Sequence, residues 1–137
     1  MNIVFVSAHA CIRVQKMALP LTQAGHKVHL IAKKIPSFYE CYDTFSIYSD
    51  AGQLINTVNR FEQIGDVDVY HCHNEPSWFV TILKERTEKP VVIDVHDTYL
   101  TRLTPEECSS LTNCGFNPFR VSNEERLNFR LADGLVF

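Results

Sequence analysis

Short apolar runs alternate with segments of helical period along the whole chain, and this alternation limits the fold more than any other feature. The runs span residues 2–7, 26–32, 45–48, 67–73, 91–96 and 134–137. A run that is apolar almost without interruption is typical of a strand buried on both faces of a sheet. Because such runs alternate with helical segments, we predict an α/β fold: a parallel sheet with right-handed crossovers and helices on both faces.

Two helices are predicted in the first half of the chain. Apolar residues recur at helical spacing from Val14 to Ala24, and Gly25 follows where a left-handed C-terminal cap is favourable. Pro20 removes one backbone hydrogen bond inside this helix, so we expect a kink or an early end. A second helix is predicted over residues 51–61, ending near Gly65.

Two more helices are predicted in the second half. Residues 77–86 form a short helix rich in large apolar side chains. Ser122 and Glu125 have the spacing of a capping box, which predicts that the last helix begins at Ser122. Leu127 and Leu131 then share one face of that helix.

Length and composition indicate one globular domain over residues 1–137. A chain of this length can bury a core of its own. Its hydrophobic content of 45%, charged content of 21% and net charge of -3 are ordinary for a globular protein. The one long stretch without a clear period, residues 97–121, is unusual for a connection inside a domain, and such loops are often functional.

Charge and hydropathy exclude two kinds of protein. The 13 lysines and arginines are dispersed, with Lys33-Lys34 the only adjacent pair, so we expect no nucleic-acid partner. No apolar run approaches the ~20 residues of a membrane span, so we expect no transmembrane segment. The predicted location is the cytoplasm, either free or peripheral at the inner membrane surface.

The cysteines do not match a known framework. Their number is odd and their spacing irregular, which argues against the disulfides of a secreted protein; they are Cys11, Cys41, Cys72, Cys108 and Cys114. The separation of Cys108 from Cys114 also differs from the CxxC spacing of structural zinc sites. A thiol or metal redox domain remains a third hypothesis, which would gain support if Cys72, Cys108 and Cys114 converged in space or if the purified protein carried zinc.

Two predicted strands end in histidines beside polar or charged residues. Residues 67–73 lead into His73-Asn74-Glu75, and residues 91–96 end in His96, followed by Asp97. In a parallel α/β sheet the carboxyl ends of the strands deliver side chains to a ligand crevice. We therefore expect the functional site at these strand ends.

Four motifs, in this order, resemble the N-terminal domain of family 4 glycosyltransferases, and the resemblance covers nearly the whole chain. They are Arg13-Val14 with Ala24-Gly25-His26-Lys27-Val28, then Asp68-Val69-Tyr70-His71-Cys72-His73-Asn74, then Val92-Ile93-Asp94-Val95-His96-Asp97, then Glu125-Arg126 with Ala132-Asp133-Gly134-Leu135-Val136. The resemblance implies a Rossmann-like sheet that forms the acceptor-side half of a GT-B fold.

The resemblance also implies an activity. Such enzymes transfer a hexose from a nucleotide sugar to a sugar, glycolipid or other acceptor, retain the anomeric configuration and use no metal or other cofactor. In the family a second domain holds most of the donor, and no such region is found in these 137 residues. We therefore expect the isolated chain to be inactive and a separately encoded C-terminal half to be one candidate partner.

By resemblance, His96 and Asp97 are the catalytic candidates. The family pattern places His96 in the cleft, where an imidazole can bind a sugar hydroxyl or a donor phosphate. The alternative for His96 is a strand-end histidine bonded only to backbone. Asp97 could orient an acceptor hydroxyl or cap the following segment, and both roles stay open.

The turn after the first strand departs from the family pattern. It is Ser7-Ala8-His9-Ala10-Cys11, whereas family members often have glycines that let the backbone approach the donor diphosphate. Close approach of a diphosphate is therefore in doubt here. His9 or Arg13 could still bind an anion of the substrate.

The strand that ends in His73 supplies the other substrate-binding candidates. His71 and His73 point to the same side because side chains alternate along a strand. We expect His73 to reach the cleft and His71 to pack in the core. Asn74 and Glu75 either bind sugar hydroxyls or form the turn before the next helix.

Two alternatives concern the site and the whole chain. Three strand ends could bring His9, His73 and His96 together as a zinc site. The chain could also be a stand-alone ligand-binding or partner-docking module without catalysis. Well-covered side chains near Phe137 would favour that module, whereas an exposed apolar surface there would favour a truncated or split enzyme.

Overall fold

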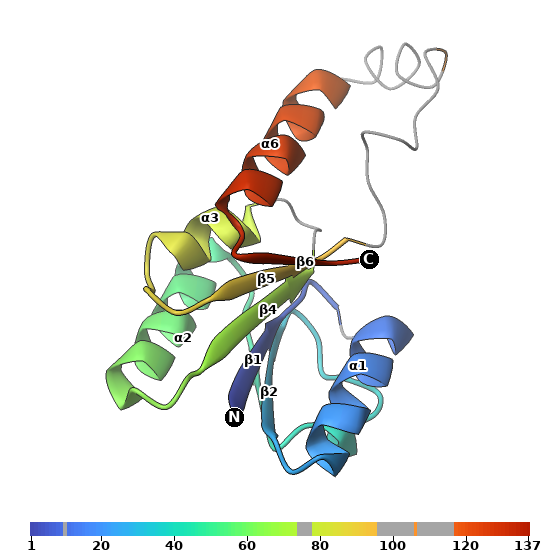
Figure 1. Cartoon of the computed structure of the whole chain (residues 1–137), viewed down its shortest axis with the longest axis vertical. Coiled ribbons are helices and arrows are strands. Elements are labelled where there is room, and N and C mark those ends of the chain that lie inside the picture. The colour runs from blue at the N-terminus through green and yellow to red at the C-terminus, as the bar shows by residue number, and fades with distance from the viewer. Residues whose placement is uncertain (10, 74–77, 96–105, 107–116) are drawn as a thin grey trace.

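The chain folds around one six-stranded parallel sheet in the computed structural model, which describes residues 1–9, 11–73, 78–95, 106 and 117–137 (Figure 1). The strand order is β3-β2-β1-β4-β5-β6, and every neighbouring pair is parallel. The strands are β1 (Asn2–Val6), β2 (Lys27–Ala32), β3 (Thr44–Ile47), β4 (Val69–His73), β5 (Val91–Asp94) and β6 (Gly134–Val136). All six predicted strands are thus found, several of them shorter at one end than the apolar runs.

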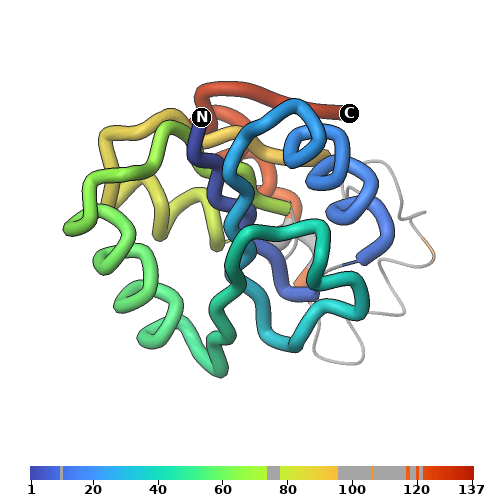
Figure 2. Tube along the Cα trace, turned by 90° about the horizontal axis from the view of Figure 1, so that it is seen from below, coloured from blue at the N-terminus to red at the C-terminus, as the bar shows by residue number. Residues whose placement is uncertain are grey.

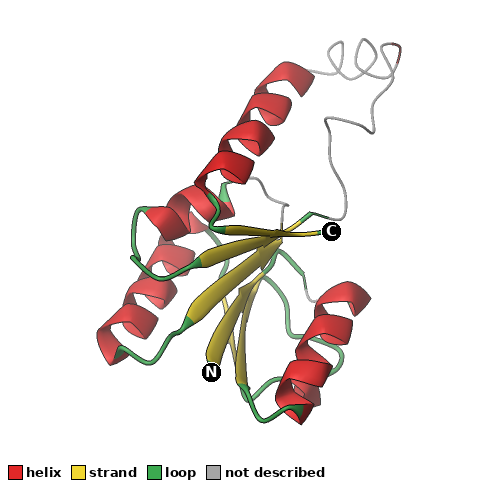
Figure 3. Ribbon diagram, in the orientation of Figure 1, coloured by secondary structure: helices red, strands yellow, loops and turns green. Residues whose placement is uncertain are grey.

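Helices cover both faces of this sheet, as the alternation predicts. Helix α1 (Ile12–Gln23) lies on one face beside the short 3₁₀ helix η1 (Tyr39–Cys41). The opposite face carries α2 (Ala51–Ile64), α3 (Phe79–Lys84) and α6 (Pro118–Leu131) (Figure 3). Figure 2 shows α1 in blue and α2 in green on opposite sides of the strands. This α/β arrangement is consistent with a Rossmann-like fold.

Each face of the sheet has its own buried cluster. On the α1 side, Val14 and Ala18 pack on alternate residues of β1 and β2 such as Phe5 and Leu30. On the other side, Leu54 and Val58 of α2, with the apolar residues of α3, pack on the intervening strand residues. The continuous apolar runs are therefore explained, since successive side chains point into different clusters and both are buried.

The helix boundaries follow from local residues. Asp50 caps α2, where its side chain accepts a hydrogen bond from the backbone N–H of Gln53 at 2.9 Å, and Gly65 ends it in the left-handed conformation at φ 72°. Gly25 likewise follows α1 at φ 83°. Pro20 does not end α1 early, because the helix continues to Gln23.

The predicted start of the last helix is wrong. Helix α6 begins at Pro118, with the Asn117 side chain accepting a hydrogen bond from the backbone N–H of Arg120 at 3.0 Å. Proline at the first position has the backbone angle of a helix and lacks an N–H that would have no partner there. Ser122 therefore lies inside α6, and the segment without a period ends before residue 121.

The buried face of α6 is partly polar. Leu127 is 50% exposed, whereas Glu125 and Asn128 are both 2% exposed. Phe129 and Leu131 pack against the cluster on the α3 side of the sheet. Polar side chains thus occupy part of the buried face of α6, and of the two leucines expected on one face only Leu131 packs on the sheet.

Candidate functional site

The carboxyl ends of the strands form the edge at which the predicted site lies. β1 pairs with both β2 and β4, and the chain crosses from one side of β1 to the other between β3 and β4. Ligands of open parallel sheets bind outside the carboxyl ends of the strands at such a switch point. Ser7, which follows β1, and His73, which ends β4, both lie at this edge.

An ion pair joins the start of α1 to the end of β5. Nε of Arg13 donates to both carboxylate oxygens of Asp94 at 2.9 Å, and Nη2 donates to Oδ1 at 2.7 Å. Charge-assisted, forked pairs of this kind are among the strong hydrogen bonds in proteins. It connects two of the motifs in the family resemblance, Arg13-Val14 and the strand end that contains Asp94.

The two partners of this ion pair differ in how far their side chains are buried. The Asp94 side chain has 0% exposure, whereas that of Arg13 is 35% exposed. Hydrogen bonding to Asp94 raises the pKa of Arg13 above its ordinary value, although burial partly opposes the shift. A buried carboxylate without a cation would be costly, so Arg13 compensates the charge of Asp94.

This pairing changes how Arg13 can meet a ligand. Nε and Nη2 of Arg13 already bind the Asp94 carboxylate, so the positive charge of Arg13 is largely compensated. Nη1 has no acceptor among the residues that the structure describes. The exposed part of the guanidinium is therefore suited to donate to a neutral acceptor such as a hydroxyl or carbonyl oxygen.

His73 lies beside Asp94 and has little contact with solvent. Its side chain is 3% exposed, and its Nε2 lies 3.6 Å from Oδ2 of Asp94. The register of β4 with β5 places His73 directly beside Asp94, on the α1 side of the sheet. His73 thus reaches the expected edge, but as a buried neighbour of a carboxylate.

His71, two residues earlier, packs against the sheet. Its ring lies 4.5 Å from that of Phe5, centroid to centroid, and Nδ1 is buried without a hydrogen-bond partner in the described part of the chain. Burial lowers the pKa of His71; Arg13 lowers it further, and Asp94 acts in the opposite direction. This geometry agrees with a packing role for His71.

The turn after β1 is organised by its own polar groups. Ser7 Oγ donates to the carbonyl oxygen of His9 at 2.6 Å, and the backbone N–H of Cys11 donates to the same oxygen at 2.9 Å. The His9 side chain is exposed. Cys11 is the N-cap of α1 but makes no side-chain cap, and the first turn holds no acidic residue. The N-terminus of α1 therefore keeps its partial positive charge uncompensated by an acidic residue of that turn.

Tyr48 and Lys33 adjoin the same turn and had no role in the sequence-based site. The Tyr48 hydroxyl donates to the carbonyl oxygen of Ser7 at 3.3 Å, and burial raises the pKa of Tyr48 to about 12. Lys33 Nζ lies 5.9 Å from the centre of the Tyr48 ring. Tyr48 is therefore protonated at neutral pH and acts as a donor that holds the turn.

Four of the seven predicted site residues cannot be placed. Asn74, Glu75, His96 and Asp97 lie outside the described residues. Of the other three, Arg13 and His73 meet around Asp94, and His9 is exposed on the nearby turn. Asp94 itself was not singled out, although a charged residue inside an apolar strand signals a buried group that needs a partner.

The described residues give no support to a metal centre. Among them, no group of three histidine, cysteine, aspartate or glutamate side chains is arranged to hold an ion. His96, which belongs to the zinc hypothesis, and Cys108 and Cys114, which belong to the redox hypothesis, lie outside this part of the chain. Cys72 is fully buried, and burial raises its pKa, so its thiol is unreactive.

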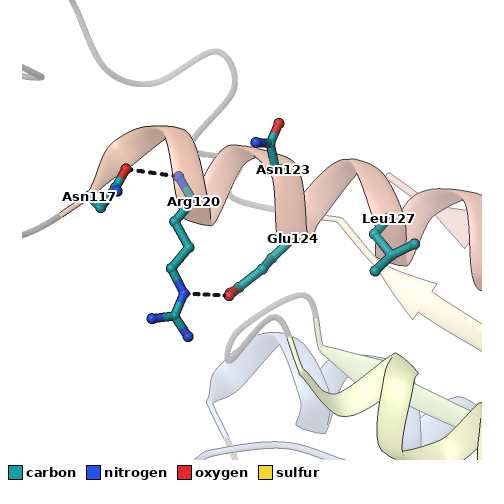
Figure 4. Close-up of a pocket in the computed structure, with 5 residues that line it drawn as sticks. All are labelled: Asn117, Arg120, Asn123, Glu124 and Leu127. Carbon is teal, nitrogen blue, oxygen red and sulfur yellow. Dashed lines mark hydrogen bonds and ion pairs between the residues drawn. The ribbon is translucent and has the colours of Figure 1, made fainter.

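A hollow of about 460 Å³ lies along the exposed side of α6 (Figure 4). The described residues that line it are Asn117, Arg120, Asn123, Glu124 and Leu127. Arg120 Nε donates to Oε1 of Glu124 at 2.9 Å, so this lining also carries a compensated charge. None of the predicted site residues is among them.

Comparison with known proteins finds no relative of this chain. No family model matches the chain, and no curated protein does. In the described parts of the chain, no helix is both long and apolar enough to cross a membrane.

Proposed function

We propose that this chain is the acceptor-side half of a retaining glycosyltransferase that transfers a hexose from a nucleotide sugar to a sugar, a glycolipid or another acceptor. The observation that carries the proposal is the ion pair between Arg13 and Asp94. Each residue belongs to a different motif of the family resemblance, and the two meet at the edge of the sheet where such folds bind ligands. Motifs that act together in one site are expected to meet in this way.

The roles that we propose for the individual residues follow from how deeply each of the two ion-pair partners is buried. Arg13 and Asp94 hold the start of α1 against the end of β5, and the free edge of the guanidinium donates to an acceptor oxygen. His96 and Asp97 come after Asp94 and Val95 in the chain and act on the reacting hydroxyl and phosphate. Most of the rate would come from positioning the two substrates and from stabilising the leaving diphosphate.

The donor site would come largely from outside these 137 residues, on a second unit in the same or a separate chain. Exposed apolar side chains at the β6 edge of the sheet support such a partner unit: Leu135 is 42% exposed, Val136 37% and Phe137 83%. Apolar side chains gathered at an edge strand are typical of a surface that another unit covers. They favour this proposal over a stand-alone binding module.

Sugar binding to the purified chain tests the proposal directly. We would record the imidazole signals of the six histidines by NMR while adding methyl glycosides of common hexoses, and separately nucleotide sugars. The expected result is a saturable shift of His73, beside Asp94, with glycosides. His26, whose Nδ1 lies 3.4 Å from the N-terminal amine at the opposite edge, serves as the unaffected control.

Two outcomes would overturn the proposal. One is the absence of any saturable shift at His73 with every glycoside tested. The other is a shift that persists unchanged in Arg13→Met, because the proposed acceptor contact needs that guanidinium. Sugar transfer from a nucleotide donor by the 137-residue chain alone would refute only the placement of the donor site outside it.

A further inference from the structure

Strand β3 lies at one edge of the sheet and, in the described part of the chain, pairs only with β2. An edge strand leaves a row of backbone N–H and C=O groups without a partner strand, and native proteins commonly protect it with lysine, proline or a bulge. The sequence of β3, Thr44-Phe45-Ser46-Ile47, has no charged residue and no proline, and its register with β2 is regular. This edge is therefore open to pairing with another strand.

The apolar side chains of β3 share one face and are only partly covered. Phe45 is 41% exposed and Ile47 43%. The register places them beside Leu30 and Ala32, which are buried in the cluster on the α1 side of the sheet. The apolar surface of that side therefore continues past its buried cluster to the open edge.

The segment that leads into β3 presents two exposed aromatic side chains as well. Phe38 is 49% exposed and Tyr39 62%. Their backbone is fixed to the domain, because Thr22 Oγ1 of α1 donates to the Cys41 carbonyl oxygen at 2.9 Å. Single exposed apolar residues are common, but a local group of them marks an interaction surface. We call residues 38–47 the β3 edge.

We propose that the β3 edge binds the β3 edge of a second copy of this chain, with the two strands antiparallel about a two-fold axis. In such a dimer the same patch is used by both copies. With Ser46 opposite Ser46, Phe45 of each copy lies opposite Ile47 of the other, and aromatic and β-branched side chains form favourable cross-strand pairs. Moving the axis by one residue would set Ile47 opposite Asp43, or Phe45 opposite Ser49. The residue pattern therefore selects one register.

The charges around β3 favour the same arrangement. Antiparallel pairing brings the amino end of one β3 to the carboxyl end of the other. Glu40 and Asp43 are exposed at the amino end, and Lys33-Lys34 are exposed where β2 ends, beside the carboxyl end of β3. Lys27 offsets one charge at the first end and Asp50 one at the second, so the two ends keep opposite signs. Complementary charges fix the orientation of an interface.

The contact is small, which predicts a weak and reversible dimer. β3 has four residues, whereas stable interfaces bury about 1,200–2,000 Å² in total. The inference does not depend on sugar transfer. It also leaves β6, at the other edge of the sheet, for the second unit proposed above.

Sedimentation velocity of the 137-residue chain over a wide range of concentrations, under reducing conditions, tests this dimer. We expect the weight-average sedimentation coefficient to rise with concentration towards that of two chains. Phe45→Lys should weaken the association at least about tenfold, because a lysine on an edge strand opposes pairing. Leu135→Lys is the matched control, since Leu135 is 42% exposed on β6, and it should leave the association unchanged. Circular dichroism checks that both variants are folded.

A charge exchange tests the orientation of the two copies. Lys34→Glu alone and Glu40→Lys alone should each weaken association, because like charges then meet at both ends of the contact. An equimolar mixture of the two variants should associate more strongly than either variant by itself. Association of the mixture that is no stronger would contradict the antiparallel arrangement.

Ser46→Cys locates the two-fold axis. Residues directly opposite in an antiparallel pair have Cα atoms about 4.5–5.5 Å apart, which suits a disulfide. With glutathione disulfide as oxidant, the two introduced thiols should form a bond between two copies and release two glutathione thiols. Ser49→Cys is the control and should link much more slowly, because Ser49 lies away from the axis. Mass spectrometry of peptides identifies each bond.

Three results would overturn the proposal. One is a chain that stays monomeric at every concentration, which would leave the β3 edge to a strand of another protein. Another is Leu135→Lys weakening the association as much as Phe45→Lys, which would assign the dimer to β6. The third is Ser49→Cys linking two copies as fast as Ser46→Cys.

Discussion

Arg13 and Asp94 lie 81 positions apart in the chain and form a forked ion pair in which the carboxylate is completely buried. The pair fastens the first turn of α1 to the last residue of β5. Two segments that flank the carboxyl edge of the sheet are thereby held together, one of which leads directly to His96 and Asp97. The geometry of this edge therefore depends on a contact between distant parts of the sequence.

Removing the arginine should destabilise the fold. Arg13→Met leaves the buried Asp94 carboxylate without its cation, and such losses cost about 3–5 kcal/mol in fully buried pairs. Because the guanidinium is 35% exposed, we expect the free energy of unfolding to fall by about 2–3 kcal/mol. Urea denaturation of the purified variant measures the change.

A double-mutant cycle with Asp94→Asn isolates the pair from the rest of the fold. The double variant should be more stable than the sum of the single effects implies, with a coupling energy of about 1–2 kcal/mol. Lys84→Met with Asp133→Asn is the matched control, since the carboxylate of that ion pair is 44% exposed rather than buried, and the pair should couple by less than about 1 kcal/mol. Equal coupling in both cycles would contradict the importance assigned to Arg13 and Asp94.

The stability of the chain should fall as the pH drops below neutral, in part because of His71. Burial lowers its pKa from the ordinary 6.5, so the unfolded chain binds a proton more readily than the folded one. The contribution of His71 is fully present above pH 6.5 and is lost as the pH falls towards the lower, folded pKa. Burial shifts His29 in the same direction.

Urea midpoints at about pH 7.5 and about pH 5.5 test this linkage. His71→Gln should reduce the difference between the two midpoints, and adding His29→Gln should reduce it further. Asn56→Gln, an exposed change on α2 that adds or removes no titratable group, should leave the difference as it is. An unaltered difference in the double histidine variant would show that other groups control the pH response.

The cysteines should differ strongly in reactivity. Cys72 has 0% exposure and burial raises its pKa, whereas Cys11 is partly exposed at the start of α1. We expect iodoacetamide to modify Cys72 at least about a hundredfold more slowly than Cys11 in the native chain. Mass spectrometry of peptides after timed quenching gives both rates, and equal rates in urea confirm that folding causes the difference.

The start of α6 can be tested with two alanine substitutions. Asn117→Ala removes the side chain that caps the helix and should lower the free energy of unfolding by about 1 kcal/mol. Ser122→Ala changes a residue inside the helix and should alter it by less than about 0.5 kcal/mol. The reverse order of effects, measured by urea denaturation, would favour the capping box that the sequence alone indicates.

The alternation of apolar runs with helical periods was enough to predict the α/β class, six strands and helices on both faces. That success has a physical reason, because strands of a parallel sheet bury both faces and leave a continuous apolar signal. The same signal predicted the last helix but not the polar part of its buried face, where Glu125 and Asn128 lie. Periodicity cannot recognise a buried face that is partly polar.

The candidate site was predicted only in part. The strand ends indicated the edge where His73 lies, because the carboxyl ends of parallel strands meet at one edge of a sheet. The role of Asp94 was missed, and Arg13 was assigned to a ligand rather than to a carboxylate of the chain itself. A side-chain partner 81 positions away leaves no local trace in one sequence.

The amino-acid sequence by itself therefore determined the elements, their class and the edge at which polar side chains gather, because local propensity and burial act on neighbouring residues. Only the tertiary structure decided which of these side chains meet. The pairing of Arg13 with Asp94, the burial of His73 and the exposure of Phe38 and Tyr39 all depend on how distant segments pack. Contacts between distant segments depend on the order of the strands and the placement of the helices. The spacing of residues along the sequence does not specify either of these.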